Sequence, residues 1–254
     1  MPFYYYLIAA AASLVAGIIN TIAGNGSSIT LAVLMQVLCF PAKEANATIR
    51  VGVLAGTVGA LPAFYRKGHI RLKREGLLIF CMTTGALIGI FTALSIDNDS
   101  FKEIFKYLFI VMLVLALVDT KSWLKKTEEQ KRLSAFIIIP LYLLLGFYGG
   151  FVQMGIGVFF LFVTVLGARY NIVDAAALKA FCIFLYTPAA ILIFALNGLI
   201  HWEIAVVMAI GEWSGGLIGA KIATEKPYAA VLAHRLLVVV LVITILNAFF
   251  NPAL

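Results

Sequence analysis

Residues 20–28 read Asn20-Thr21-Ile22-Ala23-Gly24-Asn25-Gly26-Ser27-Ser28, and they interrupt an otherwise apolar stretch of the chain. A second interruption reads Gly149-Gly150-Phe151-Val152-Gln153-Met154-Gly155-Ile156-Gly157. The apolar runs that follow, 27–40 and 156–168, are too short to span, because a helix needs about 20 residues to cross the hydrocarbon core. The two interruptions therefore predict broken helices inside the bilayer, where protein or a water-filled cavity must cover them. The alternative is a plain loop at the membrane surface.

Composition places the breaks in a membrane protein. Of the 254 residues 63% are hydrophobic and 12% charged, with a mean hydropathy of +1.04, whereas soluble domains have about 45–50% apolar and about 25% charged residues. Ten apolar runs follow one another, at 3–22, 27–40, 46–65, 77–95, 101–119, 134–152, 156–168, 172–197, 202–222 and 229–250. This pattern predicts an all-α polytopic membrane protein embedded in a lipid bilayer. The net charge of +7 gathers in short loops, so it indicates orientation in the membrane and not nucleic-acid binding.

The ten runs are five runs used twice. A shift of 129 residues places Gly26 on Gly155, Ala47 on Ala176, and Arg50 on Lys179. With one inserted residue the shift becomes 130, and further pairs coincide: Gly68 with Gly198, Gly85 with Gly215, and Gly89 with Gly219. The sequence thus predicts two five-segment repeats, 1–119 and 134–254, joined by a basic linker at 120–133. Their small-xxx-small glycine pairs predict close helix packing.

Loop charges predict that the repeats are inverted. The loop 65–75 carries five Lys or Arg residues, whereas its counterpart 197–203 carries none. The next loop, 95–100, is acidic, while its counterpart is basic. Because basic loops face the cytoplasm, equivalent loops should lie on opposite sides, with both chain termini on the outer side.

Two cations are the main candidates for function. Arg50 and Lys179 occupy equivalent positions inside apolar runs, where a charge costs roughly 3 kcal/mol. The alternative is that each side chain snorkels to the nearest interface. As an equivalent pair on inverted repeats, they are expected to approach the centre from opposite sides and to bind an anion.

Polar groups at the breaks complete the candidate substrate site. Half-helix N-termini point free N–H groups at anions, and Ser27 and Ser28 suit an N-cap. The expected substrate ligands are Asn20, Asn25, Gly26, Ser27, Ser28, Asn46, Arg50, Gln153, Gly155 and Lys179. Glu212 lies inside another apolar run, where it is either a proton-coupling carboxylate or a salt-bridge partner of Lys179 or Arg50.

Other chemistry has no support in the sequence. There is no GxxxxGK[ST] nucleotide motif and no GxSxG nucleophile motif. His69, His201 and His234 lack metal-ligand spacing, so neither a metal nor another cofactor is expected. The three cysteines are interpreted as small buried hydrophobes. Helix dipole and capping account for Glu44 and Asp174.

At the repeat motifs the chain resembles the sulfite exporter (TauE/SafE) family of membrane permeases. The likeness covers nearly the whole chain and is carried by four stretches: Gly17-Ile18-Ile19-Asn20-Thr21-Ile22-Ala23-Gly24-Asn25-Gly26-Ser27, Ala45-Asn46-Ala47-Thr48-Ile49-Arg50, Gly146-Phe147-Tyr148-Gly149-Gly150-Phe151, and Ala176 to Lys179. Asn25, Ser27, the Ile49-Arg50 pair and the Gln153-Met154 pair depart from the family pattern. The resemblance implies transport of small sulfur-containing anions such as sulfite, thiosulfate or sulfonates, in a bacterial inner membrane.

Three functions remain open at this point. A secondary transporter would bind its anion between the breaks and alternate access as one repeat rocks against the other, with proton movement at Glu212. A membrane-embedded enzyme would need nucleophiles, bases or metal ligands gathered at one interface. A non-transporting membrane subunit gives no reason for paired intramembrane cations.

Overall fold

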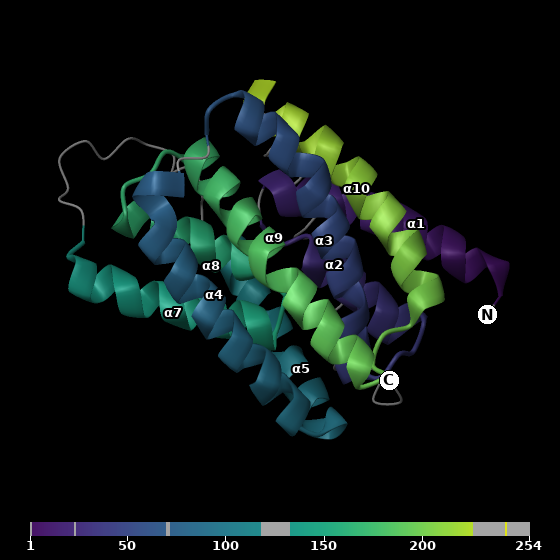
Figure 1. Cartoon of the computed structure of the whole chain (residues 1–254). Coiled ribbons are helices and arrows are strands. Elements are labelled where there is room, and N and C mark those ends of the chain that lie inside the picture. Colours follow the sequence, from purple (N-terminus) through teal and green to yellow (C-terminus); the bar gives the residue numbers. More distant parts are fainter. Residues whose placement is uncertain (1, 23, 70–71, 118–132, 226–241, 243–254) are drawn as a thin grey trace.

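The computed structural model describes residues 2–22, 24–69, 72–117, 133–225 and 242, and in these ranges the chain forms helices joined by short connections, without a strand (Figure 1). The elements are α1 (Phe3–Ile22), α2 (Ser27–Ala32), the π-helical η1 (Val33–Val37), α3 (Ala42–Arg66), α4 (Leu72–Ser95), α5 (Asn98–Leu117), α7 (Ala135–Phe151), α8 (Ile156–Phe162), the π-helical η2 (Val163–Gly167), α9 (Ile172–Leu196) and α10 (Trp202–Glu225). The predicted all-α class is confirmed. The predicted linker and the last apolar run lie almost wholly outside the described residues.

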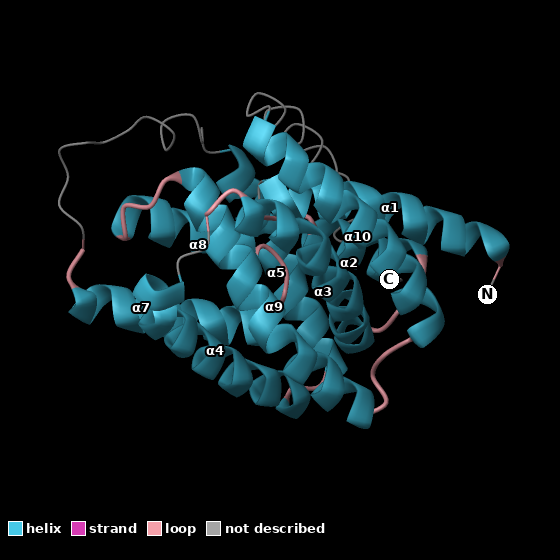
Figure 2. Cartoon of the chain, turned by 45° about the horizontal axis from the view of Figure 1, so that its top comes forward, coloured by secondary structure: helices cyan, strands magenta, loops and turns pink. Residues whose placement is uncertain are grey.

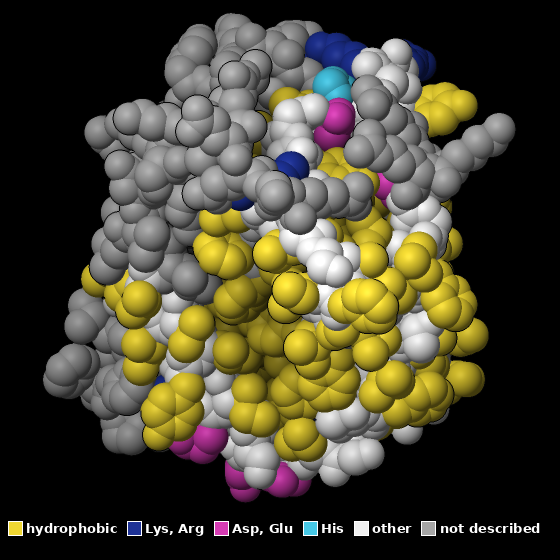
Figure 3. Space-filling model, turned by 90° about the vertical axis from the view of Figure 1, so that its left-hand side faces the viewer, with side chains coloured by type: hydrophobic (Ala, Val, Ile, Leu, Met, Phe, Trp, Pro, Cys, Tyr) yellow, Lys and Arg dark blue, Asp and Glu magenta, His cyan; other side chains and the backbone are white. Residues whose placement is uncertain are grey.

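The surface is that of a multi-pass membrane protein. Five described helices are long and apolar enough to span a bilayer: Phe3–Ile22, Ala42–Arg66, Glu75–Ser95, Ile172–Leu196 and Trp202–Ala223. Figure 3 shows a broad band of hydrophobic side chains across one face, with acidic groups at the lower rim, and basic groups, a histidine and further acidic groups near the upper rim. Large side chains such as Phe80, Phe91 and Phe136 are exposed. An apolar patch of this extent needs lipid to cover it.

The order of elements repeats along the chain. A long helix, a short helix with a π-helical turn, a 25-residue helix and a 24-residue helix occur in that order in each half: α1, α2–η1, α3 and α4, then α7, α8–η2, α9 and α10. The short helical segments Ser27–Val37 and Ile156–Gly167 reach about 16–18 Å, roughly half the hydrocarbon thickness. Inversion of one whole half relative to the other stays a prediction.

The two sequence halves interlock. α1 packs on α10 and α4 packs on α7, so each outer pair takes one helix from each half, while α3 packs against α9 between them (Figures 1 and 2). The glycine pairs make this possible. A Cβ on Gly85 would lie 2.1 Å from the Leu143 carbonyl oxygen, and a Cβ on Gly215 would lie 2.3 Å from that of Leu14. The predicted close packing at these glycines is confirmed, and it joins the halves to each other.

Cys39 departs from the prediction that all three cysteines are buried. It is exposed, with a left-handed φ of 58°, in the connection between η1 and α3. The chain turns there to start α3, and the turn directs the side chain outward. Cys81 and Cys182 are buried, as expected.

Candidate functional site

The two helix breaks lie against each other in the centre of the molecule. The Ser27 hydroxyl, at the start of α2, donates to the Gln153 carbonyl in the second break at 3.0 Å. Gly24 and Gly157 touch through their backbones, since a Cβ on Gly24 would lie 2.5 Å from the Gly157 carbonyl carbon. The structure therefore brings together the two segments that the sequence marks as interruptions, and protein covers both, as non-helical backbone at membrane depth requires.

Glycine permits both breaks, but the predicted serine caps are wrong. Gly24 has a φ of +83° and Gly155 a φ of +69°, a left-handed region that favours glycine. The N-cap of α2 is Gly26, and no side chain caps that helix. The Ser28 hydroxyl instead donates to Oδ1 of Asn25. The serines do not cap the helix because α2 already begins at Ser27, so both lie inside its first turn and not at the N-cap position.

Arg50 binds the end of α7. Its Nη1 donates to the Gly149 carbonyl at 3.0 Å and to Oε1 of Gln153 at 3.2 Å. Its Nη2 donates to the Gly150 carbonyl at 2.7 Å, and the guanidinium carbon lies 5.2 Å from the centre of the Phe194 ring. The side chain is fully buried, so it does not snorkel. Within the described residues its buried Nε has no hydrogen-bond partner, which leaves one donor for a ligand.

Lys179 makes the equivalent contact in the other half. Its Nζ donates to the Asn20 carbonyl at 2.6 Å and lies 3.5 Å from that of Thr21, at the end of α1. These carbonyls come 129 residues before the two that Arg50 binds, which is the repeat shift itself. Lys179 is 2% exposed, so snorkelling is excluded here too. Each repeat thus places its cation on the broken helix of the other repeat.

The electrostatic balance at the breaks is positive. A helix C-terminus carries roughly −0.5 of an elementary charge, whereas each cation carries a full positive charge. Among these four groups the two cations therefore overcompensate the two helix ends that they bind, leaving about one net positive charge. A positive charge at the breaks is complementary to an anion.

Two predicted ligands, Asn46 and Gln153, are hydrogen-bonded to each other at the second break. Asn46 donates from Nδ2 to the Phe151 carbonyl at 3.0 Å and accepts from the Gln153 backbone N–H at 3.3 Å. Gly155 lies close to Asn25, because a Cβ there would be 3.1 Å from Oδ1 of Asn25. These polar groups hold the two breaks in register, which positions the cations.

Glu212 lies in a tightly packed helix interface near Lys179. Neither of its carboxyl oxygens has a hydrogen-bond partner among the described residues, although the side chain is 1% exposed. It lies on a glycine face of α3, where a Cβ on Gly52 would be 3.1 Å from Oε1 and one on Gly56 would be 3.4 Å from Oε2. Of the two alternatives for Glu212, the salt bridge to Lys179 or Arg50 is therefore wrong, and the proton-coupling role stays a prediction. In an apolar helix interface the carboxyl group reaches neither cation.

A small cavity connects Glu212 with the first break. About 10 Å³ of it is open to the centre of a water-sized molecule, which corresponds to roughly one water. Its lining is formed by Gly17, Asn20, Thr21, Gly56, Thr57, Ala60, Lys179, Ala180, Ile183 and Glu212. A carboxyl group and an ammonium group therefore face one space that a single water molecule can occupy.

Tyr186 belongs to the site but escaped the sequence analysis. Its buried hydroxyl donates to Oε1 of Gln153 at 3.2 Å, on the same oxygen that accepts from Arg50. The spacing in the sequence could have identified it. Tyr186 follows Lys179 by seven residues, which is two helical turns, so both side chains lie on one face of α9. No group of three or more His, Cys, Asp or Glu side chains suited to a metal is found in the described part of the chain.

The chain is similar to known proteins over most of its length. Residues 9–248 match the family model described as "Sulfite exporter TauE/SafE". The chain is 27% identical over 242 residues to the "Probable membrane transporter protein ORF9" of Sinorhizobium sp, covering 95% of this chain and 91% of the relative. It is 28% identical over 214 residues to a "Probable membrane transporter protein" of Haemophilus influenzae, covering 84% and 82%. It is 26% identical over 218 residues to "Probable membrane transporter protein YfcA" of Escherichia coli, covering 84% and 79%. No solved structure matches the chain.

Proposed function

The chain belongs to the sulfite exporter TauE/SafE family, and we propose from this premise that it is a secondary transporter for a small anion. The substrate class is a sulfur-containing oxyanion or organosulfonate, such as sulfite, thiosulfate or a sulfonate. Sulfur enters the proposal through the family, and negative charge enters through the residues at the breaks. The protein works in the inner membrane of a bacterium, with its N-terminus on the outer side.

The main support for the proposal is that each repeat buries one cation against the broken helix of the other repeat. Arg50 and Lys179 are each buried on the end of the other half's broken helix. Burying an isolated charge is costly, and two helix ends offset only part of it. An anion that binds between the breaks would offset the rest, and the unpartnered Nε of Arg50 supplies a free donor for it.

Alternating access is part of the proposal. The cavity beside Lys179 has room for about one water molecule, which is too little for sulfite or a sulfonate. In the proposed mechanism an anion enters this cavity when the halves move relative to each other, opening one side at a time. The contacts between the breaks, such as the one from Ser27 to Gln153, are those that such a movement changes.

Proton coupling at Glu212 is part of the proposal. Unpaired carboxyl groups inside a membrane protein are typical of proton pathways. Glu212 shares its cavity with Lys179, so a change of its charge acts on the cation that binds the first break. That link is a route by which proton movement can drive the anion.

The test is anion counterflow in proteoliposomes loaded with unlabelled sulfite, measured as uptake of radiolabelled sulfite. Arg50→Gln and Lys179→Gln keep hydrogen-bond donors but lose the charge, and each should reduce uptake at least about tenfold, the equivalent of 1.4 kcal/mol. The matched control is Lys43→Gln, because Lys43 also donates to helix-end carbonyls, those of Leu94 and Ile96, but away from the breaks. Normal uptake by both central variants would refute the assignment.

A further inference from the structure

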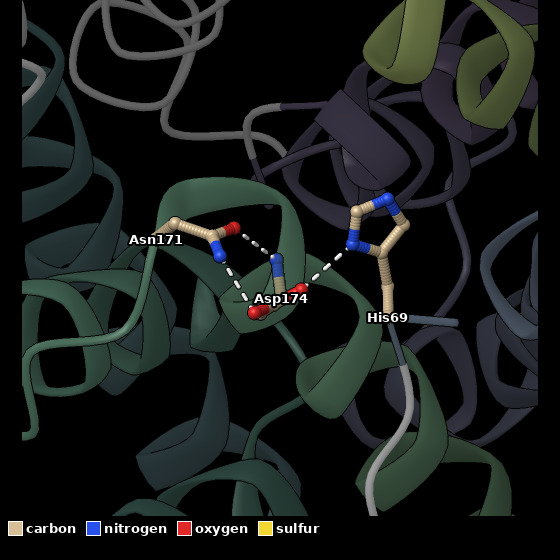
Figure 4. Close-up of polar contacts among 3 residues, drawn as sticks. All are labelled: His69, Asn171 and Asp174. Carbon is tan, nitrogen blue, oxygen red and sulfur yellow. Dashed lines mark hydrogen bonds and ion pairs between the residues drawn. The ribbon is translucent and has the colours of Figure 1, made fainter. Parts of the chain in front are cut away.

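A histidine–carboxylate pair joins the end of α3 to the start of α9. His69, three residues after α3, donates from Nδ1 to Oδ1 of Asp174 at 2.7 Å (Figure 4). Asn171 fixes the carboxylate in place: its Nδ2 donates to Oδ2 at 2.6 Å, and its Oδ1 accepts from the Asp174 backbone N–H at 2.8 Å. The sequence interpretation of Asp174 as a capping residue was therefore incomplete.

The same pair recurs where α9 ends and α3 begins. His201, in the connection that follows α9, donates from Nε2 to Oε2 of Glu44 in the first turn of α3. Its ring lies 4.3 Å from that of Phe40, and its backbone N–H donates to the Thr48 hydroxyl at 3.1 Å. The start of each helix thus meets the end of the other, so α3 and α9 are antiparallel. Each helix has 25 residues, and Glu44 and Asp174 each lie two residues inside the start of their helix, so the two pairs lie about 30 Å apart, near opposite ends of the helix pair.

Each pair lies one to two turns outside one of the two buried cations. Arg50 follows Glu44 by six residues along α3, about 9 Å, and Lys179 follows Asp174 by five residues along α9, about 7.5 Å. Along the α3–α9 pair, Glu44 and His201 therefore lie between Arg50 and one end of the two helices, and Asp174 and His69 lie between Lys179 and the other end.

The pairs are suited to opening. Their side chains are between 15% and 41% exposed, and partly exposed ion pairs contribute only about 0.2–1 kcal/mol. Contacts of this strength contribute little to the stability of the fold, yet they can shift an equilibrium between two conformations by up to about fivefold.

We propose that the two pairs are the gate latches of the transporter: Glu44–His201 closes the path to Arg50, and His69–Asp174 closes the path to Lys179. This inference rests on the proposed function. Both latches are closed in this structure, which is consistent with the small central cavity. Transport requires that they open alternately. All four residues are positioning residues, since none of them contacts the breaks.

The test is thiol accessibility at two matched reporters, in a variant whose three native cysteines are replaced by alanine. The first reporter is Ala47→Cys, at a position between Glu44 and Arg50. The second is Ala176→Cys, at the equivalent position of the other repeat, between Asp174 and Lys179. Both alanines are buried. A membrane-impermeant maleimide is applied separately to each face of oriented vesicles. His201→Ala should raise labelling at position 47 about two- to fivefold and lower it at position 176. His69→Ala should do the reverse.

Two further variants separate gating from general loosening. The exchange Glu44→His with His201→Glu restores the pair in reverse and should restore the labelling of the unmodified latch. Tyr6→Phe removes the hydrogen bond of Tyr6 to Glu203, which joins other helices, and should change neither reporter. If both histidine variants raise both reporters together, or change neither, the latch proposal is overturned. Labelling needs no substrate, so it is independent of the sulfite counterflow assay, which is run in parallel. If the two histidine variants shift labelling in opposite directions but the native protein shows no sulfite counterflow, only the identity of the transported anion is refuted.

Discussion

The backbones of Gly24 and Gly157 lie in direct contact and join the two helix breaks. A Cβ on Gly157 would lie 2.3 Å from the Gly24 Cα atom, closer than any side chain permits. Gly157→Ala should therefore force the breaks apart and lower the free energy of unfolding by about 1–3 kcal/mol. Thermal unfolding in detergent measures the effect. The control is Gly76→Ala in α4, where a Cβ meets nothing within 4 Å and stability should stay unchanged or rise slightly. Equal melting temperatures of Gly157→Ala and the native protein would contradict this packing.

Gln153 offers a test of charge against hydrogen bonding at the centre. Its Oε1 accepts from Arg50 and from Tyr186, each at 3.2 Å. Gln153→Glu should reduce sulfite counterflow by about tenfold or more, because a carboxylate at this distance neutralises the guanidinium that the substrate needs. Tyr186→Phe removes one hydrogen bond to the same oxygen without changing the charge, and should have the smaller effect. Equal losses in the two variants would mean that positive charge is not what the site supplies.

Substrate binding should be visible as stabilisation of the purified protein. A ligand at 100 times its Kd raises the free energy of unfolding by about 2.7 kcal/mol. Sulfite or thiosulfate should therefore raise the melting temperature of the native protein above that in sodium chloride of equal ionic strength. Arg50→Gln should abolish the rise, whereas Lys43→Gln should preserve it. A rise that persists in Arg50→Gln would place the anion elsewhere.

Replacement of Glu212 should separate anion exchange from proton coupling. Glu212→Gln keeps the shape of the side chain in its glycine-lined place but cannot carry a proton. Sulfite counterflow without a pH gradient should persist in this variant, while the acceleration of uptake by an imposed pH gradient should disappear. The control is Glu203→Gln on the same helix. Glu203 lies nine residues before Glu212 and accepts a hydrogen bond from Tyr6 at 2.7 Å, so this variant should retain the acceleration by the pH gradient. A gradient response in Glu212→Gln would exclude this residue as the coupling group.

The sequence alone was sufficient for the membrane class, the helix breaks, the repeated order of elements and the two central cations. Apolar runs, glycine-rich interruptions and charges in apolar segments are local properties, and they can be read without knowing what lies nearby. The equivalence of Arg50 and Lys179 was also readable, because a duplicated chain retains the spacing of its parts.

Only the tertiary structure decided what these groups bind. That Arg50 reaches the Gly150 carbonyl and Lys179 the Asn20 carbonyl, that Ser27 bonds to the opposite break, and that His69 and His201 find carboxylates all depend on helices far apart in the chain. The physical reason is that most buried polar groups take a hydrogen-bond partner, but which partner each one takes is set by the packing of the interlocked helices. Hydrophobicity places a helix in the membrane, whereas close glycine contacts between α1 and α10, and between α4 and α7, decide which polar atoms face each other.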